Sequence, residues 1–345
     1  MNFLPKFCRK IHERFRNLLF FSGMTLYAAV ALWCCGVIHY QPLFPSPWIT
    51  APLLFLYSGA VTASIFFHRK FRAGIGIGAG VTLLIAVLWF TCMKPSDRRD
   101  WQPSCARIPE VEFHPDKRTV TVKNIRDFHY RSVSDFDVRY LTQTYPLDGV
   151  REVDYAIVHW DGMELIGHVI LSFAFDDGRR LAFSAETRVE KGDPTRFLAG
   201  IYRQYEIIFI LATEEDVFQL RTNHRHEDVF LYPTTTSRKH SALLLEDLLR
   251  RSADLKKHPR FYNTITFNCT SSLYPSIRKI NPTFCGSFEM LFNGVSDFVA
   301  YRSGWLRSGR PGETFEEYKK RHYANPHVDK LTDPPDYSAR IRTGF

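Results

Sequence analysis

The chain has 345 residues and a formal net charge of +9, and 45% of its residues are hydrophobic. This length accommodates about two domains of ordinary size. A basic balance can indicate a nucleic-acid partner, but such proteins interleave a basic stripe with aromatic residues, whereas much of the excess charge here flanks the apolar N-terminal part. We therefore expect no nucleic-acid partner.

The N-terminal part is dominated by two stretches without Asp, Glu, Lys or Arg, at residues 17–68 and 73–93. Prolines interrupt the first stretch at Pro42, Pro45 and Pro47. A helix needs about 20 apolar residues to cross the hydrocarbon core of a bilayer. The pattern therefore predicts a membrane anchor with three transmembrane helices in residues 1–94, at about residues 18–38, 50–67 and 74–93.

The charges around these spans predict their orientation. The N-terminus carries five Lys or Arg residues, the first loop carries none, and the second loop carries Arg69, Lys70 and Arg72. Positively charged loops stay on the cytoplasmic side, so we expect a cytoplasmic N-terminus and residues 94–345 on the outer side of the membrane. For a protein of the bacterial inner membrane, that side is the periplasm. The first apolar run is too long for a signal peptide, and no small-residue cleavage site follows it.

The third span opens with a glycine-rich run, Gly74-Ile75-Gly76-Ile77-Gly78-Ala79-Gly80. A dinucleotide-binding glycine motif would follow a strand, whereas this run begins an apolar span. Small residues in such a position favour close packing of transmembrane helices. We therefore expect no cofactor at this run or elsewhere in the chain.

Strand signals recur in the rest of the chain. The clearest hairpin lies around Asp176-Asp177-Gly178, because Asp-Gly between alternating apolar runs favours a tight turn. Leucines at helical spacing predict an amphipathic helix over residues 241–255, and a second helix is predicted to begin at Cys269. Strands followed by helices are typical of an α+β domain.

Cys269 lies in a polar cluster, Asn268-Cys269-Thr270-Ser271-Ser272. Asn, Ser and Thr are common at helix N-termini, and a helix N-terminus lowers the pKa of a thiol. Since the thiolate is the nucleophilic form of cysteine, we expect Cys269 to be a catalytic nucleophile. The alternative is a buried free cysteine with a packing role.

His168 begins an apolar alternating run, where an imidazole is an unusual packing residue. It would act as a general base towards the thiol and would need an orienting partner. Glu186, directly or through Arg188, is a candidate for that partner, although a structural ion pair is an equal explanation. Asn268 beside the thiol and Ser172 on the strand of His168 complete the candidate set.

Other kinds of site are less well supported. His224-Arg225-His226 has a spacing that binds zinc in some proteins, but its polar surroundings favour a solvated turn, so we expect no metal. The Gly-x-Ser-x-Gly motif of serine hydrolases is absent from the sequence. Among the cysteines beyond the anchor, one arrangement pairs Cys105 with Cys285 and leaves Cys269 free.

Several motifs, in the same order, resemble the family of the Lnb N-terminal periplasmic domain, named after a bacterial lipoprotein N-acyltransferase. The likeness covers about residues 95–285, which we take as one domain, with residues 286–345 as a C-terminal extension packed on it. The stretches that carry the likeness are PSDRRDW at 95–101, NIRDFHY at 124–130, GHVILSF at 167–173, FSAETR at 183–188, QLRTN at 219–223, YP at 232–233 and FYNTITFNC at 261–269.

The resemblance implies a fold similar to circularly permuted papain-like (NlpC/P60-like) enzymes, with Cys269 as nucleophile and His168 as base. It implies a periplasmic acyltransferase that N-acylates lipoproteins through a cysteine thioester, with membrane lipids as partners and no cofactor. In the namesake the domain comes before its membrane spans, whereas here three predicted spans come first. The alternatives are a cysteine peptidase or amidase that acts on cell-wall peptides, and a non-catalytic periplasmic binding domain.

Overall fold

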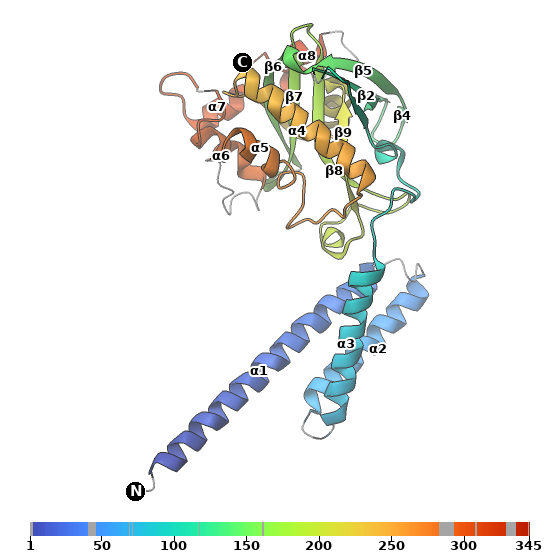
Figure 1. The fold of residues 1–345 in the computed structure, drawn as a ribbon, viewed down its shortest axis with the longest axis vertical. Helices are drawn as coiled ribbons and strands as arrows, with labels where there is room; N and C mark the ends of the chain where they lie inside the picture. Colours follow the sequence, from blue (N-terminus) through green and yellow to red (C-terminus); the bar gives the residue numbers. More distant parts are fainter. Residues whose placement is uncertain are drawn as a thin grey trace. The chain divides into compact units, whose positions relative to one another are not determined.

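The computed structural model of the chain (Figure 1) divides into two units. The helical unit comprises Met1–Pro95 and Leu198–Gln204, and the sheet unit comprises Ser96–Phe197 and Tyr205–Phe345. The structure describes residues 3–40, 46–68, 70, 72–116, 118–160, 162–282, 293–307, 309–328, 336–343 and 345.

The helical unit confirms the three predicted spans. Its helices are α1 (Phe3–Tyr40), α2 (Pro47–Phe66) and α3 (Arg72–Cys92). Within the described residues, three helices are long and apolar enough to cross a membrane, and their membrane-compatible parts are Ile11–Tyr40, Pro47–Phe66 and Ala73–Cys92. Helix α1 begins at Phe3, well before the first span, and so includes the five N-terminal Lys and Arg residues.

Hydroxyl groups and one glycine hold these helices together. The Tyr27 hydroxyl lies 3.0 Å from Ser64 Oγ, which joins α1 to α2, and the Tyr57 hydroxyl lies 2.8 Å from Thr82 Oγ1, which joins α2 to α3. A Cβ atom at Gly78 would lie only 2.4 Å from the Tyr27 hydroxyl. The glycine therefore lets α3 approach α1 closely, as the small-residue interpretation of this run requires.

The segment Leu198–Gln204 is distant in sequence from the three helices but packs with them. The Tyr202 ring stacks on Tyr40 at a centroid distance of 5.1 Å. The backbone carbonyl of Tyr202 accepts a 3.4 Å hydrogen bond from Trp89 Nε1. The guanidinium of Arg203 lies 4.0 Å from the centre of the Trp89 ring. The cluster lies at the C-terminal end of α3, and clustered Trp and Tyr rings are typical of the boundary between a membrane and water.

The sheet unit contains a mixed eight-stranded sheet in the order β1-β2-β9-β8-β7-β6-β10, with β5 paired to β2. The β2–β9 pair is parallel and the other pairs are antiparallel. The β7–β8 pair is the predicted hairpin, and Gly178 in its turn has a φ of +85°. The strands are β1 (Glu110–Phe113), β2 (Thr119–Arg126), β5 (Tyr140–Pro146), β6 (Val150–Trp160), β7 (Met163–Phe175), β8 (Arg180–Arg188), β9 (Glu206–Ala212) and β10 (Asp228–Pro233), and a separate pair consists of β3 (His129–Tyr130) and β4 (Phe136–Asp137).

Each face of the sheet has its own core. On the first face, Val169, Leu171 and Phe173 of β7 pack with leucines of the long helix α4 (Arg238–Lys257), which crosses the sheet in Figure 1. On the second face, Ile170 of β7 packs with residues of the π-helix η4 (Glu215–His224) and of the C-terminal segment. The remaining helices are α5 (Tyr274–Ile280), α6 (Ser296–Arg302), α7 (Phe315–Arg321) and α8 (Tyr337–Arg340), with short helical turns at Pro103–Cys105, Leu147–Gly149, Leu198–Tyr202, Asn293–Val295 and Asn325–His327.

The sequence located one of these helices correctly and misplaced another. The amphipathic helix predicted at residues 241–255 is confirmed as α4. The helix predicted to begin at Cys269 begins instead at Tyr274, with Pro275 in its first turn. The reason is local: the Asn268 side chain accepts hydrogen bonds from the N–H groups of Thr270 and Ser271, which forms a turn ahead of the helix.

The buried carboxyl of Glu206 should give the sheet unit a distinctive pH dependence. It is 1% exposed and accepts a 2.6 Å hydrogen bond from the N–H of Ser96, where the unit begins. Burial raises the pKa of Glu206 to about 7, against opposing effects of Ser96 and Arg99. The folded carboxyl holds its proton more tightly than the unfolded one. The free energy of unfolding should therefore fall as the pH rises from about 4.5 to 7, by at most about 3 kcal/mol.

Glu206→Gln should remove this dependence, since the amide oxygen still accepts from Ser96. Urea unfolding of the full chain in detergent, followed by tryptophan fluorescence at pH 5 and pH 8, measures it. Equal losses of stability in the wild type and the variant would show that Glu206 ionises normally.

Candidate functional site

The thiol of Cys269 lies in the turn between residues 268 and 273, ahead of α5. Asn268 shapes this turn: its Oδ1 accepts hydrogen bonds of 3.0 Å and 2.9 Å from the N–H groups of Thr270 and Ser271, and its Nδ2 donates to Thr264 O. The Asn268 and Cys269 side chains are each 5% exposed. The turn thus holds the thiol inward, within the core of the first face.

The polar neighbours of the thiol come from β7 and from the turn at Asn293. The Asn293 Nδ2 lies 3.2 Å from Cys269 Sγ and donates to Gly167 O at 2.5 Å, while its Oδ1 accepts from Gly167 N at 3.0 Å. Cys269 Sγ lies 3.9 Å from Gly167 O. Asn293 therefore connects the start of β7 to the thiol, which no feature of the sequence had indicated.

Burial governs the protonation of Cys269. Desolvation raises its thiol pKa above the ordinary value, and the hydrogen bonds from Thr270 and Asn293 offset this only in part. The expected lowering by a helix N-terminus is absent at this thiol because α5 begins five residues later and has only seven residues. In the resting structure Cys269 is a neutral thiol at neutral pH.

The imidazole of His168 lies on the other side of the sheet. Successive side chains of a strand alternate between the two faces of the sheet. Val169 lies in the first core, together with Cys269, and Ile170 lies in the second core. His168 is two residues before Ile170 and therefore faces the second core. The His168 Nε2 lies 2.7 Å from Ser184 Oγ on β8. Within the described part of the chain, no contact joins His168 to Cys269, so the structure does not bring this predicted pair together.

His168 does lie beside Glu186, as the sequence had indicated. Its Nε2 lies 3.8 Å from Glu186 Oε1, and the Ser184 hydroxyl bridges the two by donating to Glu186 at 2.9 Å. Burial, followed by the positive charge of Arg221, lowers the pKa of His168 to about 3. The imidazole is therefore neutral in the folded protein at physiological pH.

Glu186 forms ion pairs with Arg221 and Arg126, whereas the sequence had suggested Arg188. Arg221 donates to its Oε1 at 3.0 Å, and Arg126 lies 3.9 Å from its Oε2. Burial would raise the pKa of Glu186, but these two guanidinium groups outweigh it and hold that pKa well below the usual range. Glu186 is thus an anion in a buried ion-pair network.

Arg188 and Ser172 belong to separate clusters. Arg188 pairs with Asp97 at 2.6 Å, donates to the carbonyls of Cys105 and Ala106, and stacks on Trp101 at 4.3 Å. Its contacts fix the segment that leads into the sheet unit. Ser172 donates to the fully buried carboxylate of Glu214, which pairs in turn with Arg342.

The imidazole that shares the face of Cys269 is that of His159. In the β6–β7 register His159 is opposite Gly167, whose carbonyl oxygen lies 3.9 Å from the thiol. His159 also follows Ile157 by two residues on β6, and Ile157 belongs to the first core. It is 5% exposed, and its ring packs edge-on against Phe230 at 5.7 Å. No residue spacing had indicated His159, because the β6–β7 register that places it becomes visible only in the folded sheet.

Of the predicted Cys105–Cys285 disulfide, the structure describes only Cys105. Cys105 is a free, buried thiol whose Sγ donates to Val189 O at 3.5 Å. Cys285 lies outside the residues that the structure describes.

Comparison with known proteins bears on the sheet unit. Residues 136–291 match the family model of the Lnb N-terminal periplasmic domain, so the predicted family is confirmed for this part of the chain. No match is found among curated proteins or among solved structures. With three membrane-compatible helices and a domain of this family, the chain is a membrane protein with a periplasmic part.

Alkylation should reveal the protected state of Cys269. Because this thiol is buried and its pKa is raised, iodoacetamide at pH 7.5 should modify it at least about tenfold more slowly in the folded protein than in urea. Peptide mass spectrometry gives both rates, and Cys105, which is equally buried, is the internal control. Rapid alkylation of Cys269 below pH 8, with Cys105 still protected, would instead indicate a preformed thiolate.

Proposed function

We propose that the chain is a membrane-anchored, periplasmic acyltransferase that uses Cys269 as its nucleophile. The observation that carries the proposal is the thiol held at 3.2 Å from the Asn293 amide, inside a domain of the Lnb N-terminal periplasmic family. The charge pattern around the three spans supports a cytoplasmic N-terminus. A permuted papain-like arrangement is the fold we propose for the sheet unit, since its histidine-bearing strands precede the cysteine.

The reaction has two steps. Cys269 Sγ attacks the carbonyl carbon of a lipid ester, its proton passes to the base, and the alcohol leaves with a proton as the thioester forms. The amine of a lipoprotein N-terminus then attacks the thioester carbonyl, and the C–S bond breaks to give an amide and the free thiol. Membrane lipids are the proposed donors, and lipoproteins are the proposed acceptors.

The Asn293 side chain suits the oxyanion of both steps. The N–H groups of Thr270 and Ser271 already bind Asn268, so they are engaged within the turn. The Nδ2 of Asn293 instead points at the sulfur itself, and the two carboxamide–backbone hydrogen bonds to Gly167 fix its direction. A donor fixed in advance near a developing charge stabilises the transition state without reorganisation.

The base on the face of the thiol is His159, and we propose it for the proton transfer. The family resemblance assigned this role to His168, whose imidazole in this structure binds Ser184 on the opposite face. His168, Ser184 and Glu186 then act as positioning residues that fix the start of β7. His168 is the alternative base if β7 rearranges when substrate binds.

One observation favours a second candidate, a non-catalytic periplasmic binding domain. The Cys269 thiol is buried and its pKa is raised, which is typical of a structural cysteine. In that case Cys269→Ser would preserve function in cells and change only stability.

Replacement of the nucleophile should separate these candidates. The purified full chain, mixed in detergent with a phospholipid labelled in its acyl chain, should acquire label on Cys269 that neutral hydroxylamine releases. A lipopeptide with a free N-terminal amine should then receive the label. Cys269→Ala should lower transfer at least about 10³-fold, with Cys105→Ala as the control for loss of a buried thiol. Equal activity in the two variants would refute the nucleophile assignment, and release from a peptide substrate alone would indicate a peptidase.

A pair of histidine variants should identify the base. His159→Gln should lower the transfer rate about 10²- to 10⁴-fold. It should also remove the acidic limb of the pH profile, where the wild-type rate falls because the base takes up a proton. His168→Gln should lower thermal stability, and it should change the rate less than His159→Gln does while leaving the profile's shape unchanged. The reverse result in folded variants would reassign the base to His168.

A further inference from the structure

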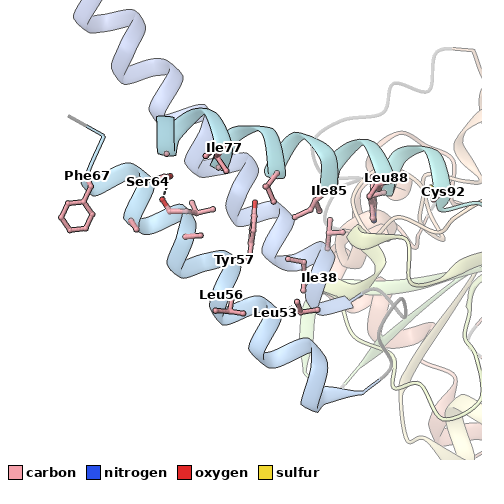
Figure 2. A pocket seen from close by; sticks show the side chains of 18 of the residues that line it. Ile38, Leu53, Leu56, Tyr57, Ser64, Phe67, Ile77, Ile85, Leu88 and Cys92 are labelled. Atoms are coloured by element: carbon pink, nitrogen blue, oxygen red, sulfur yellow. Dashed lines mark hydrogen bonds between the residues drawn. The ribbon is translucent and has the colours of Figure 1, made fainter. Parts of the chain in front are cut away.

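One cavity lies in the helical unit and contains none of the candidate catalytic residues. It has a volume of about 960 Å³ and is bounded by α2 and α3, with Val37 and Ile38 of α1 at one end. Figure 2 shows its lining side chains, from Phe67 and Ile77 at one end to Leu53 and Leu88 towards the other. This volume lies at the upper end of the roughly 300–1,000 Å³ range of small-molecule sites.

The chemistry of the lining selects the kind of occupant. Among the residues that the structure describes, no charged side chain lines the cavity. The two hydroxyl groups in the lining already have partners, because Tyr57 binds Thr82 at 2.8 Å and Ser64 binds Val61 O at 2.7 Å. A polar ligand or a stable buried water needs two to four free polar groups. The cavity therefore suits hydrocarbon.

The length of the cavity is close to the thickness of a bilayer core. Its lining on α3 extends from Gly74 to Cys92, which at 1.5 Å per residue is about 27 Å. Met93, which follows α3, adds to the lining. An acyl chain that lies along the groove therefore remains within the hydrocarbon core.

We propose that the space between α2 and α3 is a binding groove for the acyl chain of a membrane lipid. The three helices have the length and hydropathy of membrane spans, so hydrocarbon chains surround them. The groove's apolar lining and its paired hydroxyl groups hold a chain without recognising a headgroup. This assignment concerns lipid binding alone and does not rest on the proposed thiol chemistry.

Photocrosslinking in nanodiscs tests the proposal directly. The full chain carrying Cys269→Ala, which cannot consume the lipid by transfer, is placed with a phosphatidylethanolamine that bears a diazirine near the middle of one acyl chain. Crosslinks should concentrate on Leu56, Ile77 and Ile85, which line the groove, over Leu83 and Leu84, which are exposed and outside it. An equal or stronger yield on Leu83 and Leu84 would overturn the proposal, because Leu56 and Ile77 are as exposed as these controls and ordinary contact with the bilayer would label all four alike.

A matched pair of variants supplies the second readout. Ile85→Trp fills the groove, whereas Leu84→Trp adds the same side chain at the neighbouring exposed position. After detergent exchange, native mass spectrometry should show a lipid adduct on the parent protein and on Leu84→Trp, and at least a fivefold loss in Ile85→Trp. Equal retention in both variants, a parent protein without lipid, or a dimer that replaces the adduct would each overturn the proposal. If Ile85→Trp does not fold, Ala60→Trp takes its place.

Discussion

The alternation of side chains along β7 is the constraint on which the candidate site depends. Gly167 and Val169 face the core that contains Cys269, whereas His168 between them faces the opposite core. A shift of the register by one residue would exchange every side chain between the faces, and the pairings of β7 with β6, most of them between buried residues, prevent it. The sheet therefore assigns the thiol and the His168 imidazole to different environments, and any chemistry at Cys269 must first use groups on its own face.

The two faces differ in how they are stabilised. The first face is a hydrocarbon core of leucines and aromatic rings against α4. The second face buries several ion pairs, among them Arg126 with Asp216 at 2.7 Å and Arg221 with Glu186 at 3.0 Å. Buried pairs add little net stability, but removal of one partner leaves an uncompensated charge that costs about 3–5 kcal/mol. His168 is a neutral member of this charged layer, which explains why an apolar strand carries an imidazole without requiring that the imidazole be catalytic.

The sequence predicted what depends on local pattern and missed what depends on pairing. The three spans, the hairpin at Gly178 and α4 follow from apolar periodicity and turn chemistry, which a linear sequence displays. The start of α5 was misplaced because Asn268 engages the N–H groups that would have begun a helix at Cys269. His159 was missed because its place opposite Gly167 depends on the register of β6 on β7. Asn293 was missed because the chain returns to Gly167 only 126 residues later.

The proposed acyl-chain groove between α2 and α3 gives a physical reason for joining a helical unit to a domain of this family. Transfer of an acyl chain from hydrocarbon to water costs about 0.8 kcal/mol for each CH₂ group, or roughly 12 kcal/mol for a chain of sixteen carbons. A soluble domain that extracted its donor from the bilayer would have to overcome that cost before any bond changed. A groove inside the bilayer avoids it, because the chain remains in an apolar environment while the ester carbonyl lies at the membrane surface. In the proposed function the helices hold the chain through this apolar lining, and the polar groups around Cys269 recognise the reacting atoms.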